Sequence, residues 1–413
     1  MKLNFFKHQS ETLDATYDFD RVGYFLDMGL GKTFVGSEKM YQFNTPYNLL
    51  ICQKSKIKDW EEHFKTFYPE LKPIIFDKQS LDIIPTDSVL IINYDKVWRR
   101  PELTRLRNFT LMLDESSLIK NEKSNRSKFI LKLKARYVIL LSGTPTGGKY
   151  EELWSQLKLL GWNINKDLYM KQYVKQEWDD LNGGYKIVGY KNVDRLKKKL
   201  KDHGSIFIKT DEVYDLPKTN EIMVKIPSTK LYKEFAKHHI VEFEGEALIG
   251  DTPTSAKMYS RQLAGFYNHL KVEKVKELIE STNDRLVIFY QFKGDYEVLS
   301  KLCQELKRPI ATTNGDLKDM SNYEKYDNSV SLIQYQAGAM GLNLQKANKM
   351  ILFTLTESSE LYQQCLKRIH RLGQDRPCFY YYLLTDGSVE WRMLAALKQG
   401  KDYTDKLFEK EGN

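Results

Sequence analysis

The segment Asp27-Met28-Gly29-Leu30-Gly31-Lys32-Thr33 contains residue types that bind phosphate. It lies between an apolar run that predicts a strand and a segment that predicts the start of a helix. Glycines let backbone N–H groups turn toward an anion, and a helix N-terminus adds its dipole. Lys32 would reach the outer phosphates, and the Thr33 hydroxyl would bind Mg²⁺. The general phosphate-loop pattern has Gly where this chain has Leu26, so a glycine turn with an incidental lysine is the alternative interpretation.

Two adjacent carboxylates, Asp114 and Glu115, follow the apolar run 111–113. Successive residues at a strand end point in different directions. Asp114 would therefore bind a metal ion while Glu115 orients water, as in phosphoryl transfer to water. The alternative is a strand that ends in two solvated acids. The next predicted strand, 137–141, ends in the small hydroxyl residues of 142–145.

Two stretches near the C-terminus also contain residue types suited to binding phosphate. On a predicted helix, Gln364, Arg368 and Arg371 have the spacing i, i+4 and i+7 and share one face. Two arginines on one face suit an anionic transition state, whereas a surface helix with dispersed charge is the alternative. The segment 336–344 is rich in small residues, which lets backbone N–H groups approach a partner closely.

Two sets of alternating strand and helix patterns follow each other along the chain, which predicts two α/β lobes with parallel sheets. Between them lies an insertion with helical spacing, a hairpin signal near 182–190 and a basic helix at 193–200. That helix is either a phosphate-facing cluster or a solvated face. The segment 230–245 predicts a further helix. We expect a first lobe at 1–225 with a helical protrusion at about 150–215, and a second lobe at 226–413 led by a helical segment.

The composition fits a globular protein, and its mildly basic balance suits either a polyanionic partner or an ordinary solvated surface. The 413 residues carry a formal net charge of +9, and such a length predicts two or three domains. No apolar run reaches the length of a membrane span, and no signal peptide is evident, so we expect a cytoplasmic protein. The four cysteines are far apart in the sequence and argue against a zinc site or a disulfide framework: Cys52, Cys303, Cys365 and Cys378.

Taken in order, these segments resemble superfamily 2 helicase-like ATPases of the Swi/Snf type, in their short bacterial or phage form. The Asp-Met-Gly-Leu-Gly lead-in is similar to that family's motif I, so the missing first glycine is a family feature. Ser116-Ser117 stands where the family has Gly or Ala followed by His, which puts the coupling role of that His in doubt for this chain. The other matching segments, within a resemblance from Phe6 to Glu390, are Asp114-Glu115 (motif II), Ser142 to Pro145 (motif III), Gln336 to Leu344 (motif V) and Gln364 to Gln374 (motif VI).

The resemblance implies two tandem RecA-like lobes, with ATP and Mg²⁺ bound at the cleft between them and a helical insertion on the first lobe. The implied catalytic residues are Lys32, Asp114, Glu115, Arg368 and Arg371, with Thr33 and Asp114 as Mg²⁺ ligands. The implied nucleotide contacts are Gln9, Met28, Gly29, Leu30, Gly31, Lys32, Thr33, Gly341 and Asn343. The expected nucleic-acid contacts are Lys54, Lys56, Asn93, Thr144, Gly147, Gln336 and Ala337, within segments 53–58, 93–94, 144–148 and 335–339.

The function that the resemblance favours is an ATP-dependent translocase or remodeller of double-stranded DNA. One alternative is a strand-separating helicase on single-stranded DNA or RNA, which needs a separation pin or a base-stacking channel that the sequence does not single out. Another is a nucleic-acid-binding switch with a weak ATPase, because of Ser116-Ser117. We further expect a monomer, and a nuclease or a recombination protein as a candidate partner.

Overall fold

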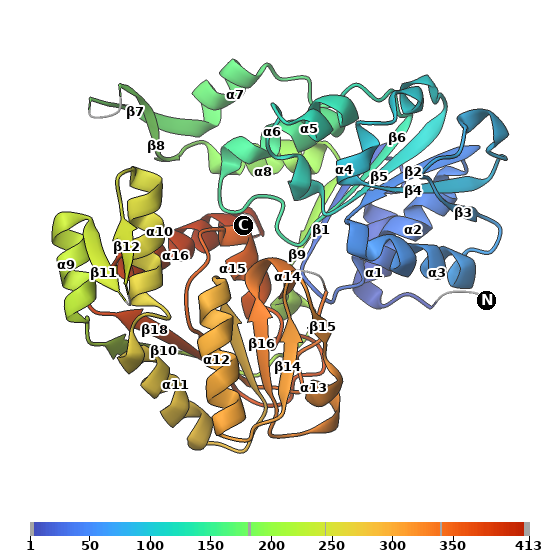
Figure 1. Cartoon of the computed structure of the whole chain (residues 1–413). Helices are drawn as coiled ribbons and strands as arrows, with labels where there is room; N and C mark the ends of the chain where they lie inside the picture. The colour runs from blue at the N-terminus through green and yellow to red at the C-terminus, as the bar shows by residue number, and fades with distance from the viewer. Residues whose placement is uncertain (1–3, 181–182, 244, 339–340, 409–413) are drawn as a thin grey trace. The chain divides into compact units, whose positions relative to one another are not determined.

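The computed structural model describes residues 4–180, 183–243, 245–338 and 341–408 (Figure 1). Contacts divide the chain into two compact units. The first unit is Met1–Tyr214 with Asp402–Asn413, and the second unit is Asp215–Lys401. Within the described residues, no helix has the length and apolar character needed to cross a membrane.

The first unit is built on a seven-stranded sheet in which every pairing is parallel. Its central strands are apolar runs because helices cover both faces of the sheet. The strand order is β3-β4-β2-β5-β6-β1-β9. The bounds are β1 (Arg21–Leu26), β2 (Tyr47–Cys52), β3 (Lys72–Ile75), β4 (Ser88–Asn93), β5 (Phe109–Asp114), β6 (Tyr137–Leu141) and β9 (Ser205–Ile208).

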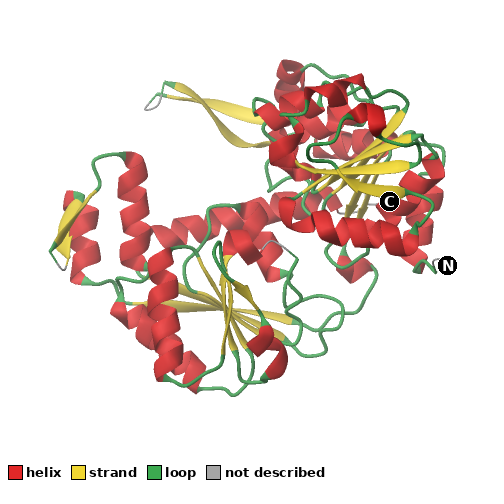
Figure 2. Cartoon of the chain, turned by 45° about the vertical axis from the view of Figure 1, so that its right-hand side comes forward, coloured by secondary structure: helices red, strands yellow, loops and turns green. Residues whose placement is uncertain are grey.

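Helices of the first unit pack on both faces of this sheet (Figure 2). One face packs against α1 (Lys7–Ala15), α2 (Lys32–Phe43) and α3 (Ile57–Phe67). The other face packs against α4 (Tyr94–Val97), α5 (Asn125–Ile130) and α6 (Trp154–Leu159). The first unit also contains short 3₁₀ helices at Lys54–Lys56, Leu81–Ile83, Pro101–Arg105, Ser116–Ile119, Tyr150–Leu153 and Thr210–Glu212.

The predicted insertion forms a separate small core on the first unit. It contains α7 (Lys166–Tyr173), α8 (Val193–Asp202) and a two-stranded hairpin of β7 (Val174–Asp179) and β8 (Gly184–Tyr190). Its buried side chains include Tyr150, Tyr169, Tyr173, Leu196 and Leu200. In the predicted basic helix, now α8, Lys197 is buried beside the two leucines, so this lysine does not belong to a solvated face.

The second unit has its own seven-stranded sheet, in the order β10-β18-β17-β13-β16-β14-β15. All pairings are parallel except that of the two-residue edge strand β15. The bounds are β10 (Thr219–Ile226), β13 (Leu286–Tyr290), β14 (Ile310–Thr313), β15 (Lys318–Asp319), β16 (Val330–Gln334), β17 (Lys349–Leu352) and β18 (Cys378–Thr385). The predicted fold class, two tandem α/β lobes with parallel sheets and an insertion on the first, is confirmed.

Helices also cover both faces of the second sheet. One face packs against α11 (His269–Glu280) and α12 (Lys293–Glu305). The other packs against α13 (Ser321–Lys325), α14 (Tyr335–Gly338), α15 (Ser359–Leu366) and the N-terminal part of α16 (Val389–Phe408). The predicted lobe boundary after residue 225 leaves β10 in the first lobe, whereas β10 pairs along its whole length with β18 of the second sheet.

The prediction of one helix over 230–245 is wrong. Helix α9 (Lys230–His238) ends where His239 adopts a left-handed conformation, with φ of 58°, and its N–H bonds to the Phe235 carbonyl. This C-terminal cap stops the helix. The chain then forms a hairpin of β11 (Ile240–Phe243) and β12 (Glu246–Ile249), followed by α10 (Pro253–Ala264).

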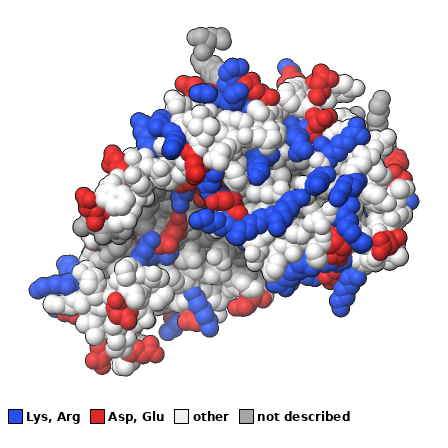
Figure 3. Space-filling model, turned by 90° about the horizontal axis from the view of Figure 1, so that it is seen from above, with Lys and Arg blue, Asp and Glu red and all other residues white. Residues whose placement is uncertain are grey.

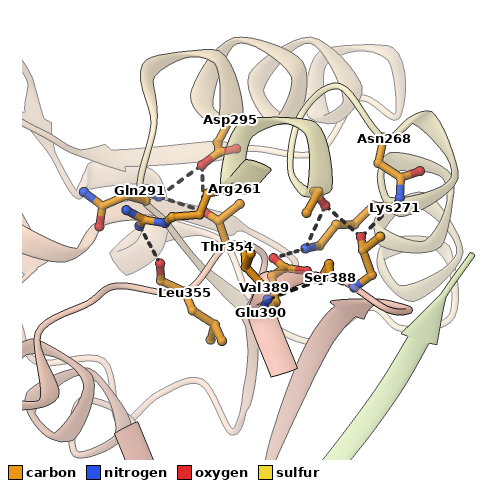
Figure 4. Close-up of polar contacts among 12 residues, drawn as sticks. Arg261, Asn268, Lys271, Gln291, Asp295, Thr354, Leu355, Ser388, Val389 and Glu390 are labelled. Atoms are coloured by element: carbon orange, nitrogen blue, oxygen red, sulfur yellow. Dashed lines mark hydrogen bonds and ion pairs between the residues drawn. The ribbon is translucent and has the colours of Figure 1, made fainter. Parts of the chain in front are cut away.

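Buried polar contacts fix the carboxyl ends of strands β13, β17 and β18 in the second unit (Figure 4). Lys271 on α11 and Glu390 on α16 form an ion pair of 2.6 Å with almost no exposed surface. The Glu390 carboxylate also accepts the Thr385 N–H at 2.8 Å, at the end of β18. Nearby, the Asp295 carboxylate accepts the Thr354 hydroxyl at 2.7 Å, which joins the start of α12 to the segment after β17.

Replacing Lys271 by methionine should destabilise the protein by about 3–5 kcal/mol, because the Glu390 carboxylate would stay buried without its counter-charge. Urea unfolding measures this as a lower midpoint. The matched control is Lys276→Met, an exposed lysine on the same helix, which should change stability by no more than about 0.5 kcal/mol. The double variant Lys271→Met/Glu390→Leu should recover most of the loss, and a double variant as unstable as the single one would contradict this account.

Candidate functional site

The predicted phosphate loop connects β1 to α2, and its backbone requires glycine. Gly31 caps the N-terminus of α2 with φ of 76°, in the left-handed region that favours glycine. A Cβ atom at this position would lie only 2.1 Å from the Gln9 Nε2 atom. The Lys32 ammonium donates to the carbonyls of Leu26 at 2.7 Å and Asp27 at 3.0 Å. The loop therefore presents a helix N-terminus and a lysine that two carbonyl oxygens hold in place.

Gln9, on α1, lies against this loop and is almost fully buried. Its Nε2 donates to the Leu30 carbonyl at 3.2 Å, and its Oε1 accepts the Phe6 N–H at 3.0 Å. The His8 ring bonds to the same Leu30 carbonyl at 3.0 Å. Gln9 is thus fixed relative to the phosphate loop, and its predicted contact with a base stays a prediction.

Asp114 is the last residue of β5, and the Trp60 indole N–H donates to its Oδ2 at 2.7 Å. Burial raises the pKa of this carboxyl, while the Trp60 bond and the positive charge of Lys32 oppose the rise. The sequence interpretation did not identify Trp60, because only the folded chain brings α3 beside the end of β5.

The residues present fit an Mg²⁺ ion. Among the described residues, neither the Thr33 hydroxyl nor Oδ1 of Asp114 has a hydrogen-bond partner. Both are hard oxygen donors, the type that Mg²⁺ prefers. These two side chains would hold the ion, with a nucleotide's phosphates as further ligands.

Glu115 adopts a left-handed conformation, with φ of 63° and ψ of 65°. Such a conformation costs a residue with a side chain about 1–3 kcal/mol and persists only when neighbours enforce it. Here the Tyr94 hydroxyl donates to the carbonyls of Asp114 at 3.1 Å and Glu115 at 3.2 Å. The Glu115 Oε1 atom accepts the hydroxyls of Ser142 at 2.5 Å and Ser117 at 2.9 Å. Its carboxylate is therefore held in one orientation.

The two serines after Glu115 have different partners. Ser117 bonds to Glu115, whereas the Ser116 hydroxyl donates to Gln156 Oε1 at 2.7 Å. Gln156 in turn donates to the Pro145 carbonyl at 2.7 Å. A Cβ atom at Gly143 would lie 3.3 Å from the Lys32 Nζ atom. Contacts therefore join the segments after β5, β6 and β1, which are neighbouring strands.

In the second unit, Arg368 and Arg371 lie close to the segment 341–344. The Arg371 guanidinium donates to Asn343 Oδ1 at 2.7 Å, and both arginines approach the Leu342 carbonyl at 3.5 Å. Burial lowers the pKa of Arg371. Its Nε atom is buried without a hydrogen-bond partner in the described part of the chain. The structure therefore brings together Asn343 and the two arginines, all predicted site residues, and leaves one buried donor that an anion would satisfy.

The prediction that these arginines share a helix face with Gln364 is wrong. Helix α15 ends at Leu366, and Lys367 caps it. The backbone then forms turns, in which the Arg368 N–H bonds to the Cys365 carbonyl and the Arg368 carbonyl accepts the Leu344 N–H. A continuous α-helix would not leave the Arg368 carbonyl available for this bond with a distant segment. The arginines are positioned by that segment and not by helical periodicity.

Residues 19–281 match the SNF2-related domain. The chain belongs to the SNF2-related family. Residues 270–373 of this SNF2-related chain also match the helicase conserved C-terminal domain.

Relatives of this SNF2-related chain come from animals, plants and bacteria. It is 24% identical to the mouse SWI/SNF-related matrix-associated actin-dependent regulator of chromatin subfamily A member 1, covering 89% of this chain and 40% of the relative. It is 25% identical to the Arabidopsis thaliana ATP-dependent DNA helicase DDM1, covering 89% of this chain and 56% of the relative. It is 25% identical to the Bacillus subtilis putative ATP-dependent helicase/translocase YwqA, covering 93% of this chain and 46% of the relative. The chain thus spans about half the length of these curated relatives.

Among solved structures, the Sulfolobus solfataricus SWI2/SNF2 ATPase core in complex with dsDNA is similar over 98% of this chain and 93% of that chain. The two are 21% identical, with a TM-score of 0.47.

The residues of the SNF2-related chain expected to contact nucleic acid differ in exposure. Lys54 and Gln336 are exposed, and Lys56 is half-buried in an ion pair with Asp59. The other four are buried: Asn93, Thr144, Gly147 and Ala337. The Asn93 side chain caps α4 by accepting the N–H groups of residues 95 and 96. Ala339, at the end of the expected segment 335–339, lies outside the described residues. The contacts themselves stay predictions.

Proposed function

We propose that this SNF2-related chain is an ATPase that moves along double-stranded DNA. The observation that carries the proposal is the carboxyl edge of the first sheet. There, a glycine loop with Lys32 lies near Asp114, and Glu115 is locked in a costly backbone conformation by its neighbours. A turn that served only to end a strand would not need that conformation.

Each residue of this edge has a distinct role in ATP hydrolysis. The N–H groups of the loop and the Lys32 ammonium bind the phosphates. Thr33 and Asp114 would hold Mg²⁺, and the bound ion would supply positive charge beside the phosphate oxygens. Glu115 accepts a hydrogen bond from the attacking water and orients it. Gln9 contacts the base, and Gly341 and Asn343 also contact the nucleotide.

Arg368 and Arg371 of the second unit stabilise negative charge on the γ-phosphate. An arginine suits this role because its charge is permanent and its planar group can make two parallel bonds. The buried, unpartnered Nε atom of Arg371 supports the assignment. Hydrolysis then depends on both units, and DNA bound by both would stimulate it.

Double-stranded DNA is the proposed polyanion. The net charge of +9 favours it, and on the face shown in Figure 3 Lys and Arg side chains gather in clusters between Asp and Glu. Relatives that are named as DNA helicases or translocases support the same assignment. A cytoplasmic location, a monomeric state and a nuclease or recombination partner stay predictions.

Steady-state ATP hydrolysis with duplex DNA, single-stranded DNA and RNA tests the proposal. We expect duplex DNA to stimulate the rate most strongly. If no nucleic acid stimulates hydrolysis, the proposed function is wrong. Displacement of a triplex strand without unwinding of the duplex would distinguish a translocase from a strand-separating helicase.

Replacing the exposed Lys54 by alanine should weaken binding to duplex DNA of any sequence. It should also reduce the slope of log K against log salt concentration by about 1, because one phosphate contact is lost. Fluorescence anisotropy over a salt series measures both effects. The control is Lys72→Ala, an exposed lysine at the start of β3 and hence at the opposite edge of the sheet. Equal slopes for Lys54→Ala and the unmodified protein would contradict the predicted contact.

A further inference from the structure

The β7–β8 hairpin projects from the body of the first unit in both views of the chain (Figures 1 and 2). It forms a separate two-stranded sheet, which pairs with no other strand in the described part of the chain. An isolated hairpin is marginally stable in water, because it has little apolar surface to bury. The nucleotide site uses none of its residues.

One face of the hairpin is apolar and aromatic. Cross-strand partners share a face, and the register pairs Trp178 with Tyr185 and Gln176 with Ile187. Trp178 is 55% exposed and Tyr185 is 70% exposed. Their ring centroids lie 5.2 Å apart, with the planes nearly perpendicular. This face therefore offers aromatic rings to a partner.

The acidic side chains of the two strands lie on the opposite face. Glu177 pairs with Lys186, and Asp179 pairs with Gly184. Each of these pairs is one residue away from the Trp178–Tyr185 pair along its strand, and successive side chains point to opposite faces. The carboxylates of the strand β7, Glu177 and Asp179, therefore lie on the face opposite to Trp178 and Tyr185.

Positive charge gathers on and beside the hairpin. The segment 166–202 holds ten Lys and Arg residues against six Asp and Glu, an excess of four in a chain whose net charge is +9. Six of the ten are exposed and make no ion pair within the described part of the chain: Lys171, Lys175, Lys186, Lys191, Arg195 and Lys201. Exposed rings together with unneutralised lysines match a nucleic acid that has bases to stack and phosphates to neutralise.

We propose that the aromatic face of the β7–β8 hairpin stacks on unpaired bases of DNA. This inference rests on the proposed function and specifies its substrate as duplex DNA with a fork or a single-stranded end. Trp178 and Tyr185 supply the stacking surface, and the lysines beside the hairpin contact the phosphates of the same strand, whereas Lys186 lies with Glu177 on the opposite face.

The experiment compares binding of the full chain to a forked duplex and to a blunt duplex of equal length, without nucleotide. In the variant Trp178→Ala/Tyr185→Ala, affinity for the fork should fall about 5- to 150-fold, which is the usual loss for one stacked base. Affinity for the blunt duplex, and its stimulation of ATP hydrolysis, should not change. If duplex DNA does not stimulate ATP hydrolysis by the unmodified protein, the proposed function is wrong, whatever the hairpin variant does.

Two controls separate stacking from a structural role of the rings. Trp178→Phe/Tyr185→Phe keeps both rings and should retain fork binding. Tyr17→Ala removes a tyrosine of the first unit that is 74% exposed and should have no effect. If the double alanine variant binds the fork as tightly as the unmodified protein does, the proposal is wrong. If it loses affinity for the fork and the blunt duplex equally, the hairpin does not recognise unpaired bases, and the proposal is also wrong.

Discussion

Replacing Lys32 by alanine should lower kcat for ATP hydrolysis by at least about 10³-fold. Removing a single neutral donor from a transition state typically costs about 10²–10³-fold, and Lys32 contributes a full charge. In the structure its ammonium donates to the carbonyls of Leu26 and Asp27. Lys32 is itself only half-buried, so the variant should still fold. Steady-state ATPase assays with saturating duplex DNA measure the change.

The control for Lys32→Ala is Lys65→Ala, which removes an exposed lysine that pairs with Glu61 on α3. It changes the net charge by the same amount and should leave kcat within experimental error. Thermal unfolding should give similar midpoints for both variants. Turnover by Lys32→Ala at the unmodified rate would show that the glycine loop is not the phosphate site.

Replacing Arg371 by alanine should lower kcat by about 10³–10⁵-fold, which is the range for an arginine that stabilises a transferring phosphoryl group. The loss should appear in kcat and much less in nucleotide affinity, because the charge develops in the transition state. Arg371→Lys should restore only part of the rate, since lysine keeps the charge but not the planar group. Single-turnover hydrolysis with bound DNA measures the chemical step directly.

The comparison variant for Arg371→Ala is Asn343→Ala. It removes the same 2.7 Å hydrogen bond, together with the proposed contact of Asn343 with the nucleotide, but leaves the guanidinium in place. If Arg371 acts on the phosphate, Asn343→Ala should cost far less than Arg371→Ala. Equal and modest losses in both variants would mean that the arginine only supports the segment 341–344.

Local sequence was sufficient to predict the strands that carry this site. The apolar runs at β1, β5 and β6 form buried parallel strands, and each is followed by the polar residues expected at its carboxyl end. Such runs are informative because a central parallel strand is buried on both faces. The glycines likewise predicted the turn of the phosphate loop, since the left-handed backbone found at Gly31 favours glycine.

Local sequence was insufficient where a distant segment decides the conformation. Periodicity predicted one helix through Arg371, but the helix ends at Leu366. The Arg368 carbonyl instead accepts a hydrogen bond from the Leu344 N–H. Periodicity likewise extended α9 across 239–245, where a left-handed His239 and a cross-strand pairing start a hairpin. The pairing of β10 with β18 depends on two segments far apart in the chain.

The sequence by itself determined the family and the two α/β lobes, and it predicted Lys32, Asp114, Glu115 and the two arginines as site residues, because these inferences depend on residue types in a fixed order. The tertiary structure alone decided which neighbours hold them. Trp60 orients Asp114, Ser117 and Ser142 orient Glu115, and Asn343 meets Arg371. Only folding brings such partners within hydrogen-bonding distance, since most are separated by tens of residues. The same reason applies to the β7–β8 hairpin, whose aromatic face exists only once the strands pair in register.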